Sequence, residues 1–425
     1  MKRRIPTCDP EPLPTADGVV RYDSHPFFDR IFWAYGFRPF FLASACYAAL
    51  SALAWAVFWL GPLELPSTIP AVGWHAHEMI FGALGAAICG FLLTAVPEWT
   101  GTPPRTGRWL ALLIGLWLVG RAAMWFAAVL PLPLVAGLNF LLFPVLAVWI
   151  VPALWRDPNR RHRSFIAVVP MLALAQVLVF LGWLDWVELD FWAEDLAQRA
   201  LNAGLHVFLI AIVLTVTRVS MVLVPLALDE QGDEDSRFMP IPPRRNLATA
   251  TLIMFAIADF VAPDNAVTGW VALAAATAQL DRMADWHVGR VLLKPYVLTI
   301  YIAYAWLAAG LAGLGFANLF GGDDFAAARH ALTMGAAGTA LMAVFMVAGL
   351  RHTGRDVVLP RLAVAAVVFV SCATALRCLT PLFWPEQYAM FGIGAAAVVW
   401  SMAMAAYLVP FAPYLLRPRV DGMPG

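Results

Sequence analysis

The stretch GWHAHEMIFGALGAAICGFLLTAVPEWTG, residues 73–101, decides the class of fold. No charged side chain occurs between residues 79 and 97. About 20 consecutive apolar residues are enough for a helix to cross the hydrocarbon core of a bilayer. The stretch therefore predicts a transmembrane helix, and it places His75, His77 and Glu78 together at one end of that helix.

The composition of the whole chain indicates a polytopic membrane protein built from helices. Hydrophobic residues make up 61% of the 425 positions and charged residues 13%, whereas soluble domains carry about 25% charged residues. The formal net charge is zero, so no basic surface suggests a nucleic acid as a partner. The five cysteines show no CxxC spacing, which argues against a disulfide framework and against a thiolate metal site.

Twelve segments are apolar enough to be interpreted as membrane spans. Their approximate limits are residues 39–60, 77–97, 109–130, 134–155, 164–184, 201–224, 247–263, 266–281, 295–314, 328–350, 360–382 and 388–411. The seventh and eighth are the shortest and are joined by the tight turn APDNA. The expected fold is thus an all-α bundle of about twelve transmembrane helices, with the lipid bilayer as its partner.

The basic residues orient this set of spans, because cytoplasmic loops carry an excess of Lys and Arg. With the N-terminus inside, the two tails and the even-numbered loops hold 23 of the 28 basic residues. The odd-numbered loops hold two, Arg199 and Arg329, and the remaining three fall inside spans. This alternation predicts that both ends of the chain are cytoplasmic.

The topology divides the chain into a membrane domain and two cytoplasmic tails. The N-terminal tail covers residues 1–38, the membrane domain 39–411 and the C-terminal tail 412–425. The first tail is polar and contains prolines, and it lacks the apolar run of a cleavable signal peptide. A hydrophilic cytoplasmic loop at 225–246 separates two groups of six spans, a division also found in transporters with two parallel repeats.

Ionisable residues at or inside the spans are the candidate functional residues, since their placement in a membrane is costly. On the outer side lie His75 and His77, His206 about 8 Å along the sixth span, and His330 at the start of the tenth. His352 lies at the inner end of the tenth span. About 33 Å of helix separates His330 from His352, so one metal centre cannot use both.

Helical spacing indicates which way two of these residues face. Small residues recur every four positions after Glu78, at Gly82, Ala86 and Gly90. Such a stripe suits close helix packing, so we expect Glu78 to face the bundle and to hydrogen-bond a neighbouring imidazole. His330 heads a similar stripe of Met334, Gly338 and Met342. Methionine is common in apolar helices, so Met334 and Met342 are interpreted as packing residues.

The residues themselves leave two interpretations open. A single histidine at a membrane interface is usually a polar anchor at the level of the head groups. For four histidines on one face, next to a carboxylate, a role as ligands or as a proton relay is as well supported as a role as polar anchors. Imidazole binds both haem iron and copper, so the residue types do not distinguish the two metals.

Six motifs now carry a family resemblance. They are GFRPFFL (36–42), WHAHEMIFG (74–82), GFLLTAVPEWTG (90–101), YAWLAAGL (304–311), HALTMGAAGT (330–339) and HTGR (352–355). In this order over twelve spans, they resemble the NnrS family. The resemblance runs from about residue 25 to the last span.

The resemblance implies a bacterial inner-membrane protein that contains haem and copper and takes part in nitric oxide metabolism and resistance to nitrosative stress. It does not say which histidines bind haem and which bind copper. The matching residues are Arg38, His75, His77, Glu78, Arg121, His330, His352, Thr353 and Arg355. We expect His75, His77 and His330 to hold the metal, His206 and His352 to be further cofactor ligands, and Glu78, Arg121, Thr353 and Arg355 to support them.

The chain also departs from the family pattern. Glu98 stands where the family commonly has Asn, and Tyr301 where it commonly has His. Residues 218–224, Val347 and Arg351 differ as well. Because Tyr is a rarer haem ligand than His, Tyr301 makes a metal site on the inner side a weaker prediction than one on the outer side.

The sequence leaves open whether the protein is an enzyme, and two alternatives remain beside the NnrS-like metalloprotein. One is a respiratory-type haem-copper oxidoreductase, which needs about six intramembrane histidines where this chain offers four or five near its spans. The other is a proton- or anion-coupled secondary transporter, in which His206, Glu78 and Arg121 would line the pathway.

Overall fold

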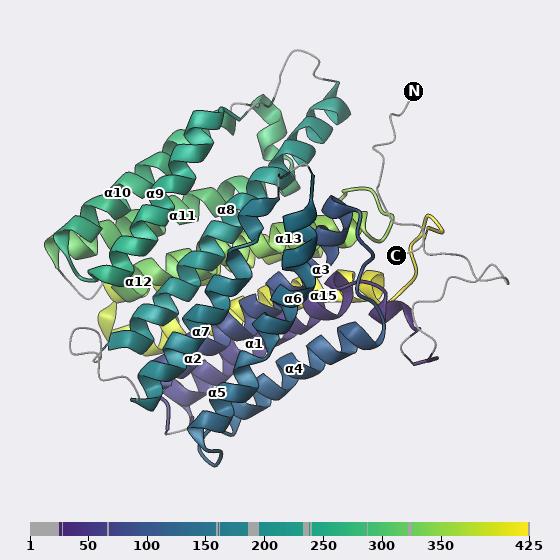
Figure 1. Ribbon diagram of the computed structural model, residues 1–425. Helices are drawn as coiled ribbons and strands as arrows, with labels where there is room; N and C mark the ends of the chain where they lie inside the picture. Colours follow the sequence, from purple (N-terminus) through teal and green to yellow (C-terminus); the bar gives the residue numbers. More distant parts are fainter. Residues whose placement is uncertain are drawn as a thin grey trace.

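The computed structural model describes residues 25–423, except positions 28, 66–67, 159, 161, 186–194, 233–237, 239, 287 and 322–324. Most of the predicted N-terminal tail, residues 1–24, therefore lies outside the described residues. Within the described part the chain is a bundle of helices without a strand (Figure 1). The all-α prediction is confirmed.

The helices lie at the positions that the apolar pattern predicts. The long ones are α1 (Phe37–Leu60), α3 (Gly85–Thr100), α4 (Arg108–Trp125), α6 (Leu142–Arg156), α7 (Val168–Leu184), α8 (Leu196–Gln231), α9 (Pro242–Val261), α10 (Ala266–Met283), α11 (Pro295–Phe320), α13 (Thr339–Arg351), α14 (Arg361–Phe383) and α15 (Ala396–Leu415). Shorter pieces precede several of them, namely α2 (Ala71–His77), α5 (Leu132–Phe140) and α12 (Phe325–His330).

Ten of the resulting helical segments in the described chain are long and apolar enough to cross a membrane. The protein is therefore a multi-pass membrane protein. The two that fall short are α9 and α10, the predicted seventh and eighth spans. Their polar residues explain the difference: α9 begins with Arg244 and Arg245, and α10 ends with Asp281 and Arg282.

The geometry still places α9 and α10 within the bundle. They lie alongside α8 and α11 (Figure 1), and their 20 and 18 residues give lengths of about 30 and 27 Å. Ile253, Met254 and Ile257 expose large apolar side chains on the outside of α9, as a helix facing lipid would. Since α9 and α10 form a hairpin, the orientation of every other span is the same whether or not they cross.

Three loop boundaries differ from the prediction. Residues 225–231 belong to α8, which continues through Pro225, and α9 starts at Pro242, so the predicted loop 225–246 is shorter. The α8 extension is fixed by Glu230, whose carboxylate pairs with Lys294 at 2.5 Å. Similarly, α1 begins at Phe37 and α15 continues to Leu415, inside the two predicted tails.

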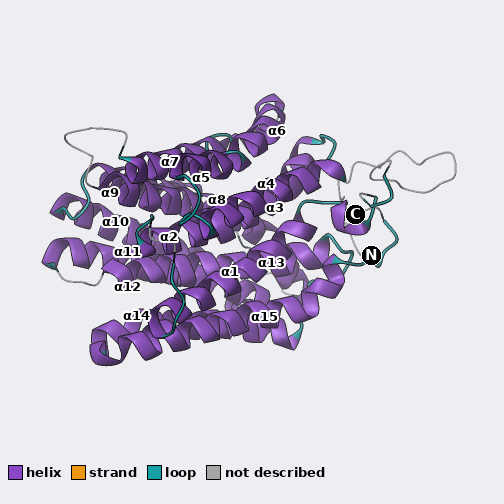
Figure 2. Cartoon of the chain, turned by 90° about the horizontal axis from the view of Figure 1, so that it is seen from below, coloured by secondary structure: helices purple, strands orange, loops and turns teal. Residues whose placement is uncertain are grey.

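The first and last spans are joined at one end of the bundle (Figure 2). The fully buried Arg38 of α1 donates from Nη1 to the carbonyl oxygens of Leu415, at 2.6 Å, and Arg417, at 2.9 Å. These carbonyl groups belong to the end of α15, where helical hydrogen bonds run out. Arg38, the charged residue of the motif GFRPFFL, thus caps the last helix.

Three segments are π-helical rather than α-helical. They are η2 (Glu78–Leu84), η7 (Ala331–Gly338) and η9 (Tyr388–Ala395). Each interrupts a span: η2 lies between α2 and α3, η7 between α12 and α13, and η9 before α15. Because π-helical turns often mark functional sites, these segments direct attention to the space between them.

We expect α9 and α10 to cross the membrane, which alkaline phosphatase fusions in a bacterial host can test. A fusion at Asp264, between the two helices, should be as active as one at Gly61 after α1, while a fusion at Arg105 before α4 should be inactive. An inactive Asp264 fusion beside an active Gly61 fusion would mean that the hairpin stays on the cytoplasmic side and that ten spans is the correct number.

Candidate functional site

A cavity of about 220 Å³ lies between the three π-helical segments, and we call it the histidine cavity. His75, from the end of α2, and His330, from the end of α12, both line it. The remaining walls come from α1, α8, α13, α14 and α15. Two of the histidines that the sequence marked as metal ligands are therefore brought together.

The ring of His75 is held by packing rather than by hydrogen bonds. It stacks on Trp55 with ring centroids 4.4 Å apart and an interplanar angle of 17°. Its Nδ1 is buried and has no hydrogen-bond partner among the described residues. A buried polar atom without a partner is costly, which distinguishes this imidazole from a core histidine whose hydrogen bonds are satisfied.

His330 is oriented by the helix that carries it. Its Nδ1 lies 2.6 Å from the carbonyl oxygen of Ala326. A carbonyl oxygen can only accept, so Nδ1 carries the hydrogen and Nε2 keeps its lone pair. An imidazole whose second nitrogen is fixed in this way is the usual form of a metal-bound histidine.

The other side chains that line the histidine cavity are mostly apolar, and several of them carry polarisable sulfur atoms. Four thioethers line it, those of Met79, Met334, Met342 and Met404. The stripe from His330 to Met342 thus faces the cavity as its spacing predicted. Arg377 of α14 adds one buried cation, whose Nη1 donates to the hydroxyl of Tyr388. No carboxylate of the described chain lines this space.

Each π-helical segment contributes to the walls of the histidine cavity. Met79 comes from η2, Met334 from η7 and Ile393 from η9. A π-helical turn holds one extra residue and rotates the side chains that follow it. The sequence pattern assumed regular α-helices, so it could not predict this convergence.

Glu78 belongs to a separate buried network. Its Oε1 lies 2.5 Å from Nη1 of Arg121 and 2.8 Å from Nδ1 of His77. Its Oε2 accepts from the hydroxyl of Tyr47. Arg121 in turn donates from Nη2 to Asn139 at 2.5 Å. The carboxylate faces the bundle and bonds a neighbouring imidazole, as the sequence predicted.

This arrangement gives His77 a different environment from His75. With Nδ1 on Glu78, its Nε2 lies 3.3 Å from the amide of Gln176. His77 is fully buried and does not line the histidine cavity. The two rings diverge because residues two apart on a helix point in different directions. Both nitrogens of His77 are engaged, so the geometry favours His77 as a partner of Glu78 over a metal ligand.

His206 lies away from both groups. Its Nε2 is 3.8 Å from the buried carboxylate of Asp259 on α9, and its ring contacts Phe255. It lines neither the histidine cavity nor a second cavity near the other end of the bundle. Neither of these two cavities therefore places a cofactor next to His206, which the sequence predicted as a cofactor ligand.

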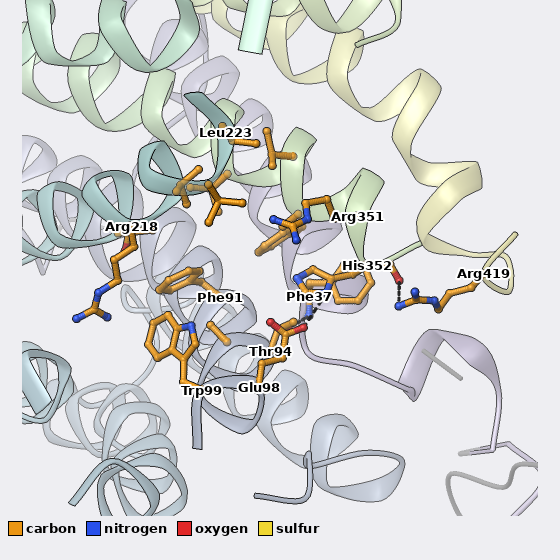
Figure 3. Close-up of a pocket in the computed structure, with 18 residues that line it drawn as sticks. Phe37, Phe91, Thr94, Glu98, Trp99, Arg218, Leu223, Arg351, His352 and Arg419 are labelled. Carbon is orange, nitrogen blue, oxygen red and sulfur yellow. Dashed lines mark hydrogen bonds and ion pairs between the residues drawn. The ribbon is translucent and has the colours of Figure 1, made fainter. Parts of the chain in front are cut away.

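A second space, of about 430 Å³, lies toward the other end of the bundle (Figure 3). We call it the arginine cavity, because Arg218, Arg351 and Arg419 line it. His352 also lines it, with Nδ1 3.0 Å from Oε1 of Glu98. The Glu98 that departs from the family pattern is thus the partner of His352.

The remaining predicted residues have local roles. Thr353 donates to the carbonyl oxygen of Gly349 at 2.6 Å, and Arg355 lies over the ring of Tyr414 at 4.1 Å. Neither lines a large cavity. Tyr301 lies beside Trp286 and does not line the arginine cavity with His352.

The sequence analysis missed several polar residues. Tyr47, Asn139 and Gln176 complete the Glu78 network, and Arg377 lines the histidine cavity. Asn139 and Gln176 were visible as amides inside apolar runs, which is a signal because such residues need partners in a membrane.

The donor set of the histidine cavity fits a soft transition metal or a haem iron. No three His, Cys, Asp or Glu side chains of the described residues converge on one point, so a closed structural metal site is not formed there. The cavity instead offers two imidazoles and four thioethers. Imidazole suits copper and iron, and thioether suits copper(I).

Comparisons with known proteins give one match. The sequence profile of the family described as NnrS protein matches residues 31–419, nearly the whole chain. A comparison with curated proteins finds no match.

The Glu78 network predicts a specific pattern of stabilities. Arg121→Met removes the cation and leaves the carboxylate of Glu78 buried, which should lower the free energy of unfolding by about 3–5 kcal/mol. The double variant Arg121→Met/Glu78→Gln should lose less than Arg121→Met, because no uncompensated charge is left. Denaturant unfolding in detergent micelles measures both.

Arg108→Met, at the exposed start of the same helix, is the matched control and should change stability by about 0.5 kcal/mol or less. A double variant less stable than Arg121→Met would show that the two charges are not coupled.

Proposed function

The chain belongs to the NnrS family, and on that premise we propose that it is an inner-membrane metalloprotein acting in nitric oxide metabolism or resistance to nitrosative stress. We propose further that the metal group lies in the histidine cavity, with His75 and His330 as its ligands. Haem and copper are the two groups that this proposal allows.

One observation carries the proposal: two half-buried imidazoles line a single, mostly apolar cavity, and neither Nδ1 of His75 nor Nε2 of His330 has a hydrogen-bond partner among the described residues. His330 is fixed as a lone-pair donor by Ala326, and His75 is fixed by stacking on Trp55. Placing such groups inside a membrane protein without a bound partner is costly. A bound metal would satisfy both.

The surroundings agree with nitric oxide chemistry. Haem iron or copper, when bound, would supply a coordination position for a small diatomic molecule. Nitric oxide is uncharged and weakly polar, so it enters an apolar space from the bilayer without loss of hydration. The methionine and aromatic walls of the histidine cavity favour such a molecule over water or ions.

The Glu78 network supports His75 indirectly. Arg121 and Tyr47 bond Glu78, and Asn139 bonds Arg121 from a third helix. Glu78 is the first residue of η2, directly after α2. The backbone that carries His75 is therefore fixed from the side opposite to the cavity. Precise placement of a ligand commonly depends on such outer hydrogen bonds.

A second candidate function, transport, is favoured by a different observation. A central cavity of about 40 Å³ with apolar walls lies between the other two. It shares Leu84, Leu341 and Phe345 with the histidine cavity and Phe91, Thr215 and Val344 with the arginine cavity. Three spaces thus follow one another between α3, α8 and α13, as expected for a pathway closed by an apolar constriction.

The metalloprotein proposal predicts which histidines retain the cofactor. His75→Ala and His330→Ala should each remove the main visible absorbance and most of the bound iron or copper, because each deletes one of two ligands. The matched control is His352→Ala, in the arginine cavity, which should keep both. Visible spectra and elemental analysis of the purified variants are the measurements.

Full metal content in both His75→Ala and His330→Ala would mean that the histidine cavity is not the metal site. Loss of absorbance in His352→Ala alone would move the site to the arginine cavity.

The transport candidate predicts access across the constriction. In a protein whose native cysteines are replaced, Thr333→Cys in the histidine cavity should react with a charged thiosulfonate reagent supplied only from the membrane face of the arginine cavity. Adding Ala340→Trp, in the central cavity, should block this reaction and leave labelling from the opposite face intact. No labelling from the arginine side, with normal labelling from the other, would rule out a pathway.

A further inference from the structure

The arginine cavity has the dimensions of a binding site for a small molecule. Its volume of about 430 Å³ falls within the range of roughly 300–1,000 Å³ that is typical of ligand pockets. It is separate from the histidine cavity, and the proposed metal chemistry makes no use of it. The question is which class of molecule its walls would accept.

One part of the wall is aromatic and apolar. Phe91 and Trp99 lie on one side and Phe37 on the other, with Leu223 above them in Figure 3. The Phe37 ring packs against His352 with centroids 5.3 Å apart. These rings present flat apolar faces to the space between them. A ligand of this cavity therefore needs an apolar body.

One cation in the cavity is unpaired. Arg351 ends α13, and its guanidinium group points into the space above His352 and Glu98 (Figure 3). Within the described chain it makes neither a hydrogen bond nor an ion pair. It is half-buried, so water does not fully replace the missing partner.

The other charged groups already have partners. Arg218 lies over the rings of Trp99, at 5.1 Å, and Phe165, at 4.8 Å. Arg419 pairs with Asp421 at 2.8 Å. The hydrogen bonds from Arg419 hold the pKa of Asp421 below its usual range. The two opposite charges of this pair therefore cancel.

Glu98 is bound to His352. It supplies the only carboxylate among the residues that line the cavity in the described structure. Three arginines face this single carboxylate, and Asp421 neutralises one of them. Counting guanidinium groups against carboxylates, the surplus is one positive charge.

From this geometry we propose that the arginine cavity binds a small organic anion with a single negative charge, whose carboxylate pairs with Arg351 and whose apolar body lies between Phe91, Trp99 and Phe37. A guanidinium group binds a carboxylate through two parallel hydrogen bonds. The aromatic rings then cover the part of the ligand that carries no charge.

The same features disfavour two other classes of ligand. An inorganic oxyanion would leave the aromatic faces without a contact, although Arg351 would still attract it. A neutral molecule would fill the apolar part and leave the guanidinium group unpaired, at the cost of a buried charge without a partner. An organic monoanion satisfies both parts of the wall.

Calorimetric titration of the purified protein in detergent can test this with benzoate as the probe. Benzoate should bind measurably, and benzamide, which has the same shape and no charge, should bind about 10- to 100-fold more weakly, as expected for loss of a charge-assisted hydrogen bond. Inorganic phosphate and nitrite should bind more weakly than benzoate. Equal binding of benzamide, or tighter binding of either inorganic anion, would overturn the proposal.

Variants locate the site. Arg351→Gln should weaken benzoate binding by about 10- to 100-fold, and Arg351→Lys by less, because it keeps the charge and loses the two-pronged geometry. The matched control is Arg355→Gln, four residues away, where the side chain lies over Tyr414 outside the cavity; its affinity should not change. Unchanged affinity in Arg351→Gln, or equal loss in Arg355→Gln, would place the anion elsewhere. His330→Ala should bind benzoate normally, so this result is independent of the proposed metal site.

Discussion

The ion pair between Glu78 and Arg121 is the interaction on which the first half of the bundle depends. Neither charge is acceptable alone in a membrane interior, so the pair fixes the positions of both helices. Tyr47 from α1 bonds the second oxygen of Glu78, and Asn139 from α5 bonds the second amino group of Arg121. Further hydrogen bonds from Ser44 and Trp117 to the backbone of η2 help to hold these elements in one register.

The ion pair also determines what the neighbouring residues can do. Glu78 draws His77 into the network, so His75 is left to face the opposite side of the helix. The π-helical turn that starts at Glu78 then directs Met79 toward the same cavity as His75. A polar core that supports the structure and His75, one member of the ligand-like pair of histidines, thus arise from one short motif, WHAHE. The distinction between them lies in which nitrogen atoms already have partners.

The sequence predicted the fold more completely than the site, and the physical reason is clear. Membrane spans are defined by length and hydropathy, which a sequence displays directly; the twelve predicted segments each overlap a helix. Only α9 and α10 are less apolar than a typical span. They pack against α8 and α11, so part of their surface is covered by protein. Glu78 could be assigned to the bundle interior from the spacing of Gly82 and Gly90. The different environments of His75 and His77, by contrast, depend on a π-helical turn and on partners far away in sequence.

The separation of the two large cavities has a consequence for any function of this protein. The central cavity between them is small and has apolar walls, so an ion would have to lose its hydration shell to pass. An uncharged diatomic molecule would not. In the conformation described, the apolar constriction is therefore passable for an uncharged diatomic molecule and closed to an anion that enters from the arginine cavity. A charged species could connect the two ends only if α3, α8 and α13 moved apart. The π-helical turns in the spans of α3 and α13 are the places where such a movement would need the smallest change in hydrogen bonding.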